Sequence, residues 1–275
     1  MTSPAFTAAS RDEIAIELAR IALAAGPDIM EVYAEHSAAR KKADGSPVTE
    51  ADERAEAIIY ARLKAFAPET PIVAEEAVAA GAEVVRAEEF FLVDPLDGTR
   101  EFVARNGEFT VNVALVRKGA PVAGAVYAPA LGRLWFGGET AFRVEVPVGA
   151  ALPGASAWVL IAARALPEKL IALASRSHCD AQTKAFLDRL PLSGLRSAGS
   201  SLKFCVVAEG EADVYPRFGP TMEWDTAAGD AVLRAAGGGV LTPDGQPFRY
   251  GKFEDKLRNG AFVAWGDIAS AARWR

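Results

Sequence analysis

An apolar segment that runs directly into two aspartates is the feature that most restricts this sequence. The segment is FFLVDPLDGTREF, from Phe90 to Phe102. Its first four residues are typical of a short buried strand, whereas Asp94 and Asp97 flank a Pro-Leu pair at the end of that strand. Buried carboxylates are costly unless they are paired or bind a metal ion. The sequence therefore predicts a strand that ends at a cation-binding site.

The composition indicates a globular protein with a full core. The chain has 275 residues, 51% of them hydrophobic, which suits one large domain or two moderate ones. A net charge of -6 argues against nonspecific binding of a nucleic acid polymer as the main activity. Cys179 and Cys205 show no C-x-x-C spacing, so neither a disulfide framework nor a zinc knuckle is predicted.

The hydropathy pattern of the sequence leads to an expectation about location. No segment reaches the ~18 uninterrupted apolar residues that a membrane helix needs, and the N-terminus has no basic region ahead of an apolar one. We expect a cytoplasmic protein without an integral membrane segment. Peripheral association with the inner membrane is left open, as is the choice between a monomer and a homodimer.

Helices and an antiparallel meander are predicted for the N-terminal part. A capping pattern starts a helix near Arg11, which Gly26 and Pro27 should stop or kink although the helical pattern continues beyond them. A second helix follows SPVTEAD and ends before Pro68. After the short apolar run PIVAEE and the strand that ends in aspartates, the residues from Thr110 read as successive strands separated by Gly and Pro turns.

From Ala150 the pattern changes to alternating strands and helices. Strands are predicted in KLIALASRSH, ADVYPRF and GGVLT, and helices in TKAFLDRL, SSLKFCVVAEG and about residues 225–236. The Gly/Ala/Pro-rich stretch at 148–157 divides the chain into an N-terminal α+β half, residues 1–150, and a C-terminal α/β half, residues 151–275. The predicted fold class is α/β.

Several residues near the aspartates fit either a structural or a catalytic role. Glu75 ends another apolar run and, taken alone, is more typical of an exposed acidic loop. Asp52 and Asp225 fit helix caps or first-turn acids. Gly98 permits close backbone approach and Thr99 offers a hydroxyl and an N–H, so D-x-x-D-G-T combines metal oxygens with anion donors.

The available ligand types favour a hard cation. His36 and His178 are the only histidines, so a His-rich zinc site and a Ser-His-Asp site are poorly supported. Oxygen ligands without clustered sulfur or imidazole indicate an ion such as magnesium. Two such ions ~3.5 to 4 Å apart can lower the pKa of a water, orient it and stabilise the leaving oxygen of a phosphoryl group. The sequence therefore predicts a phosphatase mechanism.

Three motifs resemble the signatures of a known family. They are AEE at residues 74–76, DPLDGT at 94–99 and WDTAAGD at 224–230. Together they resemble the magnesium-dependent, lithium-sensitive phosphatases that include inositol monophosphatase and fructose-1,6-bisphosphatase. Further segments, among them GSPVTEAD, SRSH, GSSLKFC and YPRFGPT, are similar to the bacterial CysQ-type 3'(2'),5'-bisphosphate nucleotidases. The resemblance implies a layered αβαβα sandwich with the site between the two halves.

The resemblance also implies a role for each site residue. The metal ligands would be Glu75, Asp94, the Leu96 carbonyl, Asp97 and Asp225. Glu75 and Thr99 would position the attacking water, and Asp52 would accept a hydrogen bond from the Thr99 hydroxyl. The substrate would contact the Gly98 and Thr99 N–H groups and the side chains of His178, Ser200, Ser201, Lys203, Arg217 and Asp225. The cofactor would be Mg²⁺, two or more ions per site, with Mn²⁺ as a substitute and Li⁺ as an inhibitor.

The implied reaction is hydrolysis of the 3'-phosphate of adenosine 3',5'-bisphosphate to AMP and phosphate, in support of sulfur assimilation. The 5'-phosphosulfate analogue is a second candidate substrate. An inositol or other sugar monophosphatase and a non-catalytic nucleotide sensor stay open as alternatives. Glu223, an extra acid two residues before Asp225, is expected either to repel the 5'-phosphate or to face solvent. The sequence gives no account of the apolar region 144–165.

Overall fold

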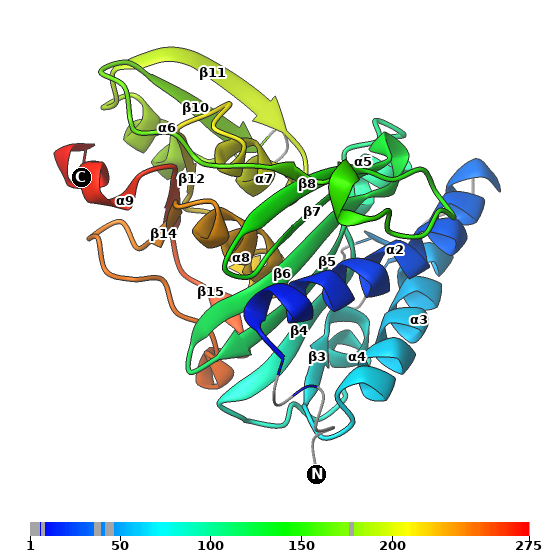
Figure 1. Cartoon of the computed structure of the whole chain (residues 1–275). Coiled ribbons are helices and arrows are strands. Elements are labelled where there is room, and N and C mark those ends of the chain that lie inside the picture. Colours follow the sequence, from blue (N-terminus) through cyan, green and yellow to red (C-terminus); the bar gives the residue numbers. More distant parts are fainter. Residues whose placement is uncertain (1–5, 7–8, 36–39, 42–46, 176–178, 275) are drawn as a thin grey trace.

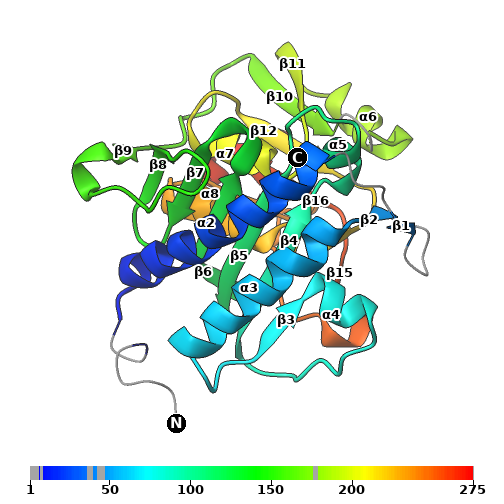
Figure 2. The ribbon, with the colours of Figure 1, turned by 90° about the vertical axis from the view of Figure 1, so that its right-hand side faces the viewer.

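Helices and sheets alternate in five layers in the computed structural model, which describes residues 6, 9–35, 40–41, 47–175 and 179–274. Helices α2 (Arg11–Glu35) and α3 (Glu50–Phe66) form the first layer and lie side by side across one face of a seven-stranded sheet (Figure 2). Helices α7 (Leu202–Ala208) and α8 (Ala227–Ala235) separate that sheet from a five-stranded one (Figure 1). Helices α6 (Ala181–Leu187) and α9 (Ile268–Ala271) cover the outer face. The predicted αβαβα sandwich is confirmed.

The seven-stranded sheet contains the predicted antiparallel meander. Its order is β3-β4-β5-β6-β7-β8-β9, and β3 and β4 form its parallel pair. The strands are β3 (Ile72–Ala74), β4 (Glu89–Asp97), β5 (Thr110–Arg117), β6 (Ala120–Ala128), β7 (Arg133–Gly137), β8 (Ala141–Glu145) and β9 (Val159–Leu160). Apolar side chains on the two faces of this sheet belong to different cores, one under α2 and α3 and the other under α7 and α8.

The five-stranded sheet has the order β11-β10-β12-β16-β14. Its strands are β10 (Leu170–Ser175), β11 (Leu192–Ala198), β12 (Val214–Arg217), β14 (Gly239–Leu241) and β16 (Phe262–Trp265). Strands β11 and β16 were not predicted from the sequence. Strand β11 is an edge strand whose residues are mostly exposed, so it carries no alternating apolar signal, and β16 is a run of only four residues.

Short elements complete the described chain. They are α4 (Glu75–Ala79), α5 (Thr99–Val103), the paired strands β1 (Arg40–Lys41) and β2 (Pro47–Val48), the paired strands β13 (Thr221–Met222) and β15 (Arg258–Asn259), and the 3-10 turns η1 (Pro129–Leu131), η2 (Ala155–Ala157), η3 (Phe253–Asp255) and η4 (Ala272–Trp274). Nowhere in the described ranges does a helix combine the length and apolar content needed to cross a bilayer.

Helix α2 does not end at Gly26 and Pro27, so the prediction of a stop there is wrong. The helix continues to Glu35 with Pro27 inside it. A proline in a helix interior costs about 3 kcal/mol, but the apolar face on both sides of it is fully buried against the sheet. Gly26 is required at this contact because an added Cβ would lie 2.8 Å from a ring carbon of Tyr127. Tertiary burial therefore outweighs the local signal.

The region 144–165 now has a structural role. Trp158 packs edge-on against Phe136, with ring centroids 5.0 Å apart, and its indole N–H donates to the Pro153 carbonyl at 2.9 Å. Leu152 also packs against the core under α2. The apolar residues of this region thus fold back onto the end of the seven-stranded sheet and lead into β9.

Candidate active site

A β-bulge turns both aspartates of DPLDGT toward the same face of the sheet. Asp94 pairs with Asn112 and Asp97 with Thr110, so β4 has one more residue than β5 in this interval. Residues two apart on a strand share a face, and the hydrogen bond from the Thr110 hydroxyl to the Asn112 side-chain oxygen, at 3.0 Å, agrees with this. The odd spacing of the two aspartates would otherwise place them on opposite faces. Pro95, which has no N–H to donate, suits the bulge.

Glu75 is positioned by the start of helix α4. The parallel strand β3 delivers the chain beside β4 and ends at Ala74, one residue earlier. A carboxylate from α3, that of Glu56, accepts the N–H groups of Glu76 and Ala77 at 2.7 and 2.8 Å and caps the new helix. The cap fixes the first turn of α4, and with it the direction of Glu75.

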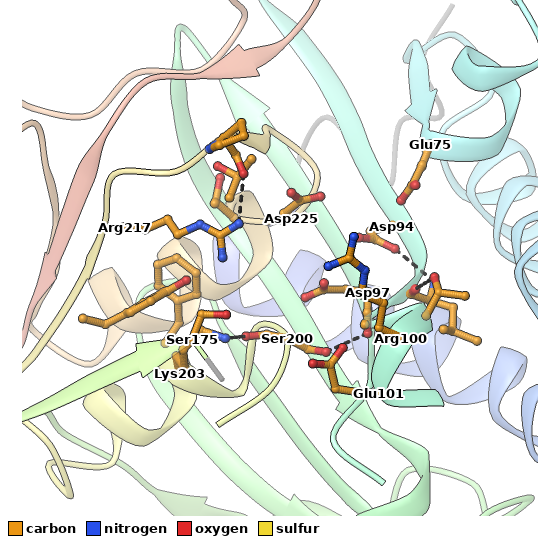
Figure 3. A pocket seen from close by; sticks show the side chains of 18 residues that line it. Glu75, Asp94, Asp97, Arg100, Glu101, Ser175, Ser200, Lys203, Arg217 and Asp225 are labelled. Carbon is orange, nitrogen blue, oxygen red and sulfur yellow. Dashed lines mark hydrogen bonds between the residues drawn. The ribbon is translucent and has the colours of Figure 1, made fainter. Parts of the chain in front are cut away.

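Asp225 lies in the turn that precedes α8. Its carboxylate accepts the Met222 N–H at 2.8 Å, and its carbonyl accepts the Ser201 hydroxyl at 2.8 Å. The ligand oxygens of Glu75, Asp94 and Asp225 lie within 4.8 Å of one another. Three elements distant in sequence thus bring three carboxylates to one point (Figure 3).

A cavity of about 260 Å³ opens beside this cluster. Among the predicted site residues it is lined by Glu75, Asp94, Leu96, Asp97, Gly98, Thr99, Ser200, Lys203, Arg217 and Asp225. Glu75, Asp94 and Asp97 lie on one side of the cavity together with Arg100, while Lys203 and Arg217 lie on the other, with Ser175 (Figure 3). The Lys203 ammonium is 5.1 Å from the centre of the Tyr215 ring. The cavity therefore joins a cation-binding side to an anion-binding side.

Two carboxyls of the cavity have raised pKa values. Burial raises the pKa of Asp97 to about 6, in spite of the nearby Lys203 ammonium, and the carboxylates of Glu101 and Glu75 raise it further. Burial also raises the pKa of Asp225 well above its usual value, with Asp97 and Glu75 adding to the effect. Carboxylates held this close favour either protons or cations.

The donor set fits magnesium. The described residues of the cluster offer carboxylate oxygens, with the Leu96 carbonyl on the same cavity wall and no sulfur or imidazole among the described lining residues. Hard divalent cations prefer such oxygen ligands. Glu75, Asp94 and Asp225 would hold an ion at this point. Asp97 and the Leu96 carbonyl, the other predicted ligands, line the same cavity outside this group of three.

Thr99 and Asp52 form the predicted pair at the edge of the cavity. The Thr99 hydroxyl lies 3.4 Å from both Asp52 Oδ1 and the Leu96 carbonyl oxygen. It has one hydrogen, so it can donate to one of them at a time. Asp52 itself is buried, and its other oxygen accepts the N–H and hydroxyl of Thr49, each at 2.7 Å. The capping box predicted from TEAD therefore also holds the acceptor for Thr99.

Gly98 allows the chain to turn into α5 at this point. Its φ of +91° lies in the left-handed region, and an added Cβ would come within 2.2 Å of the Ser200 hydroxyl oxygen. Glycine is the residue that meets both demands.

The cationic side is built on main-chain oxygens. Lys203 is 3% exposed, and its ammonium donates to the carbonyls of Ala198 and Ser200 at 3.1 and 2.6 Å. Burial lowers the pKa of Lys203 to about 8, although Asp97 acts in the opposite direction. The guanidinium of Arg217, which is 8% exposed, donates to the Pro220 carbonyl at 2.9 Å. Main-chain carbonyl oxygens thus hold both cations in place.

Of the two serines predicted to contact the substrate, Ser200 lines the cavity and Ser201 does not. Ser200 lies between the halves of the chain, with its hydroxyl 2.7 and 2.8 Å from the carbonyl oxygens of Asp97 and Glu108. Ser201 is buried behind the cavity, where it accepts from the Asn112 amide at 3.0 Å. His178, predicted to contact the substrate, lies outside the described residues.

Some residues of the site were not predicted from the sequence. Asn112 donates to Ser201 and, at 3.5 Å, to Asp97, and the signal for it was a polar residue within the apolar strand TVNVALV. Arg100 and Glu101 line the cavity directly after DPLDGT. The expectation that Glu223 faces solvent is wrong, because its carboxylate is fully buried and binds Lys252 at 3.1 Å. Glu223 is not among the residues that line the cavity, and its repulsion of the 5'-phosphate stays a prediction.

Comparisons with known proteins agree with this arrangement. Residues 10–267 match the inositol monophosphatase family, and the chain belongs to that family. The 3'(2'),5'-bisphosphate nucleotidase CysQ of Shigella flexneri is 43% identical over 251 residues, which cover 90% of this chain and 98% of that protein. The crystal structure of CysQ from Bacteroides thetaiotaomicron gives a TM-score of 0.76 at 38% identity, covering 92% and 96% of the two chains. An inositol monophosphatase from Anabaena, at 24% identity and a TM-score of 0.71 over 95% and 96%, shares the fold.

Proposed function

We propose that this protein is a magnesium-dependent phosphatase that removes the 3'-phosphate of adenosine 3',5'-bisphosphate to give AMP and inorganic phosphate. The observation that carries the proposal is the juxtaposition in one cavity of three carboxylates within 4.8 Å and two buried cations, Lys203 and Arg217. The 43% identity to a 3'(2'),5'-bisphosphate nucleotidase over most of both chains supports the same substrate. A role in sulfur assimilation follows from that substrate, and the 5'-phosphosulfate analogue is a second candidate.

The residues of the acidic side prepare the attack on phosphorus. When bound, magnesium ions supply the charge that lowers the pKa of a water and stabilises the leaving oxygen. When the Thr99 hydroxyl donates a hydrogen bond to Asp52, its oxygen keeps a lone pair that can accept a hydrogen bond from the attacking water. Glu75 faces the same space and orients that water. The Gly98 and Thr99 N–H groups at the start of α5 would bind the phosphate oxygens.

The residues of the cationic side select the nucleotide. Lys203 and Arg217 place two positive charges in the cavity and would bind the 5'-phosphate and its neighbourhood. Tyr215 and Phe204 add aromatic surface to the same wall of the cavity. A monophosphate without a second anionic group would make little use of these cations.

The test is phosphate release from adenosine 3',5'-bisphosphate and inositol 1-phosphate in parallel, with magnesium and with a chelator. The proposal predicts magnesium-dependent release with preference for the nucleotide, and loss of that preference in Lys203→Met and Arg217→Met. Preference for the inositol phosphate would replace the nucleotidase by the sugar monophosphatase. Nucleotide binding in a calorimeter without release of phosphate would favour a non-catalytic sensor.

Finer features of the site are part of the proposal. We expect two or more magnesium ions at turnover, support of activity by manganese and inhibition by lithium. The number of ions can be measured by calorimetric titration of the metal-free protein. A cytoplasmic location, the monomer or homodimer, and the division at residue 150 stay predictions.

A further inference from the structure

A fully buried acid lies two residues before the metal ligand Asp225. The carboxylate of Glu223 is 0% exposed and accepts the N–H groups of Gly251 and Lys252 at 2.8 and 2.9 Å. The Lys252 ammonium lies 3.1 Å from it, with its side chain 23% exposed. An uncompensated buried carboxylate is strongly destabilising. Here the two N–H groups and the ammonium compensate the charge of Glu223.

The hydrogen bonds around Glu223 extend to Asn259 in strand β15. The Lys252 ammonium also donates to Asn259 Oδ1 at 3.1 Å. The Asn259 amide then donates to the Met222 carbonyl at 2.7 Å and lies 3.1 Å from the hydroxyls of Thr221 and Thr226. Both threonines line the cavity. A chain of polar contacts thus runs from Glu223 through Lys252 and Asn259 back to the cavity wall.

The main chain of Glu223 fixes the turn that carries Asp225. The Glu223 N–H donates to the Leu257 carbonyl at 2.9 Å, and the Glu223 carbonyl accepts the N–H groups of Thr226 and Ala227 at 3.2 and 3.0 Å. Asp225 lies inside this turn, with its carboxylate held by the Met222 N–H. The turn is therefore tied to residues 249–259 by backbone and side chain together.

We propose that Glu223, Lys252 and Asn259 form a brace that positions Asp225 for metal binding, and that Glu223 is a positioning residue for the reaction. The brace rests on the proposed function in one respect, the role of Asp225 as a metal ligand. None of its three members lines the cavity among the described residues. Their effect on the metal site is transmitted through the turn.

The test compares the magnesium affinity of the wild type and of Glu223→Gln by calorimetry and by magnesium-dependent thermal unfolding. Glutamine keeps the size of the side chain but offers one acceptor oxygen to two N–H groups and loses the charge that faces Lys252. We expect about 10-fold weaker magnesium binding, as for other groups that support metal ligands. Activity should recover at magnesium concentrations beyond those that saturate the wild type.

Two further variants separate positioning from general stability. Asp213→Asn is the matched control, because Asp213 is a buried carboxylate that binds Arg164 at 2.7 Å and the Ile171 N–H at 2.6 Å, outside the cavity lining. It should lower the melting temperature without changing magnesium affinity. The double variant Glu223→Gln with Lys252→Met removes the unpaired ammonium, so it should regain stability but not magnesium affinity.

Each outcome decides the proposal. A folded Glu223→Gln with wild-type magnesium affinity, or an equal loss of affinity in Asp213→Asn, would overturn it. If Glu223→Gln does not fold, Asn259→Ala tests the same brace and should also weaken magnesium binding. Absence of magnesium binding to the wild type would remove the basis of the brace.

The proposed substrate is tested separately from the brace. A wild type that binds magnesium but leaves the nucleotide intact would refute the nucleotidase and leave the calorimetric comparison valid. If the wild type hydrolyses the nucleotide but Glu223→Gln keeps the wild-type magnesium affinity, only the brace is refuted.

Discussion

Replacing Asp97 with asparagine is expected to stabilise the metal-free protein and to weaken its response to magnesium. The pKa of Asp97 is raised from 3.8 to about 6, first by burial. Because the folded-state pKa exceeds the unfolded value, the folded protein retains an extra proton between about pH 4 and pH 6. Its stability falls through that window as the pH rises, and the whole cost is present at pH 7.

The size of the effect follows from this pKa difference. A difference of about two pH units corresponds to about 3 kcal/mol. The effect of the nearby Lys203 ammonium is already contained in this pKa. The figure is an upper bound because the new amide must also find hydrogen-bond partners in a buried site. Asparagine keeps the shape of the side chain, and its amide oxygen can still accept from Asn112. We expect a gain of about 2 kcal/mol at pH 7, or roughly 3 to 4 °C in Tm for a chain of 275 residues.

The assay is thermal unfolding at pH 5, 7 and 8, with a chelator and with magnesium. Magnesium should raise the Tm of the wild type by binding the folded state, and it should raise that of Asp97→Asn much less. Asp213→Asn is the control for the same chemical change at a paired carboxylate, where breaking the pair should cost about 3 kcal/mol in either buffer. A loss of stability in metal-free Asp97→Asn at pH 7, or a wild-type response to magnesium, would refute the reasoning.

Three other substitutions test separate parts of the site. Thr99→Val should lower kcat about 100-fold with an unchanged Tm, and near-normal turnover would remove Thr99 from the mechanism. Gly98→Ala should cost more than about 1 kcal/mol and most of the activity, because its φ of +91° and the Ser200 hydroxyl leave no room for a Cβ; Gly154→Ala, which meets no atom within 4 Å, is the neutral control. Lys203→Met should raise KM for the nucleotide about 10-fold and stabilise the protein at pH 7, because the pKa of Lys203 is lowered to about 8 by burial. The charged lysine costs stability below that pKa, so the gain should shrink as the pH rises from about 8 to 10.5, and a pH-independent loss of stability would contradict it.

The parts of the fold that the sequence predicted were those governed by local rules. The capping box at Thr49 and Asp52 and the alternating strands after Thr110 need only neighbouring residues for their recognition. The DPLDGT motif marked a strand end with oxygen ligands for the same reason. A local signal failed at Pro27, because the energy that keeps the helix intact comes from burial against a distant sheet.

Features that depend on distant partners could not be predicted. The bulge that turns Asp94 and Asp97 to one face is defined by pairing with β5, which begins 13 residues after Asp97. The surroundings of Glu223 are set by Gly251 and Lys252, 28 and 29 residues later in the chain. Sequence patterns identified which acids matter more readily than they identified what each acid contacts.

The central claim is that the acidic cluster holds magnesium and that the cavity directs one phosphate of a bisphosphate nucleotide to it. Phosphorus NMR of adenosine 3',5'-bisphosphate during turnover tests this most directly, because the two phosphates give separate signals. The account predicts that the 3' signal is replaced by inorganic phosphate while the 5' signal persists, with magnesium and not with a chelator. Loss of the 5' signal, or release that is independent of magnesium, would contradict it.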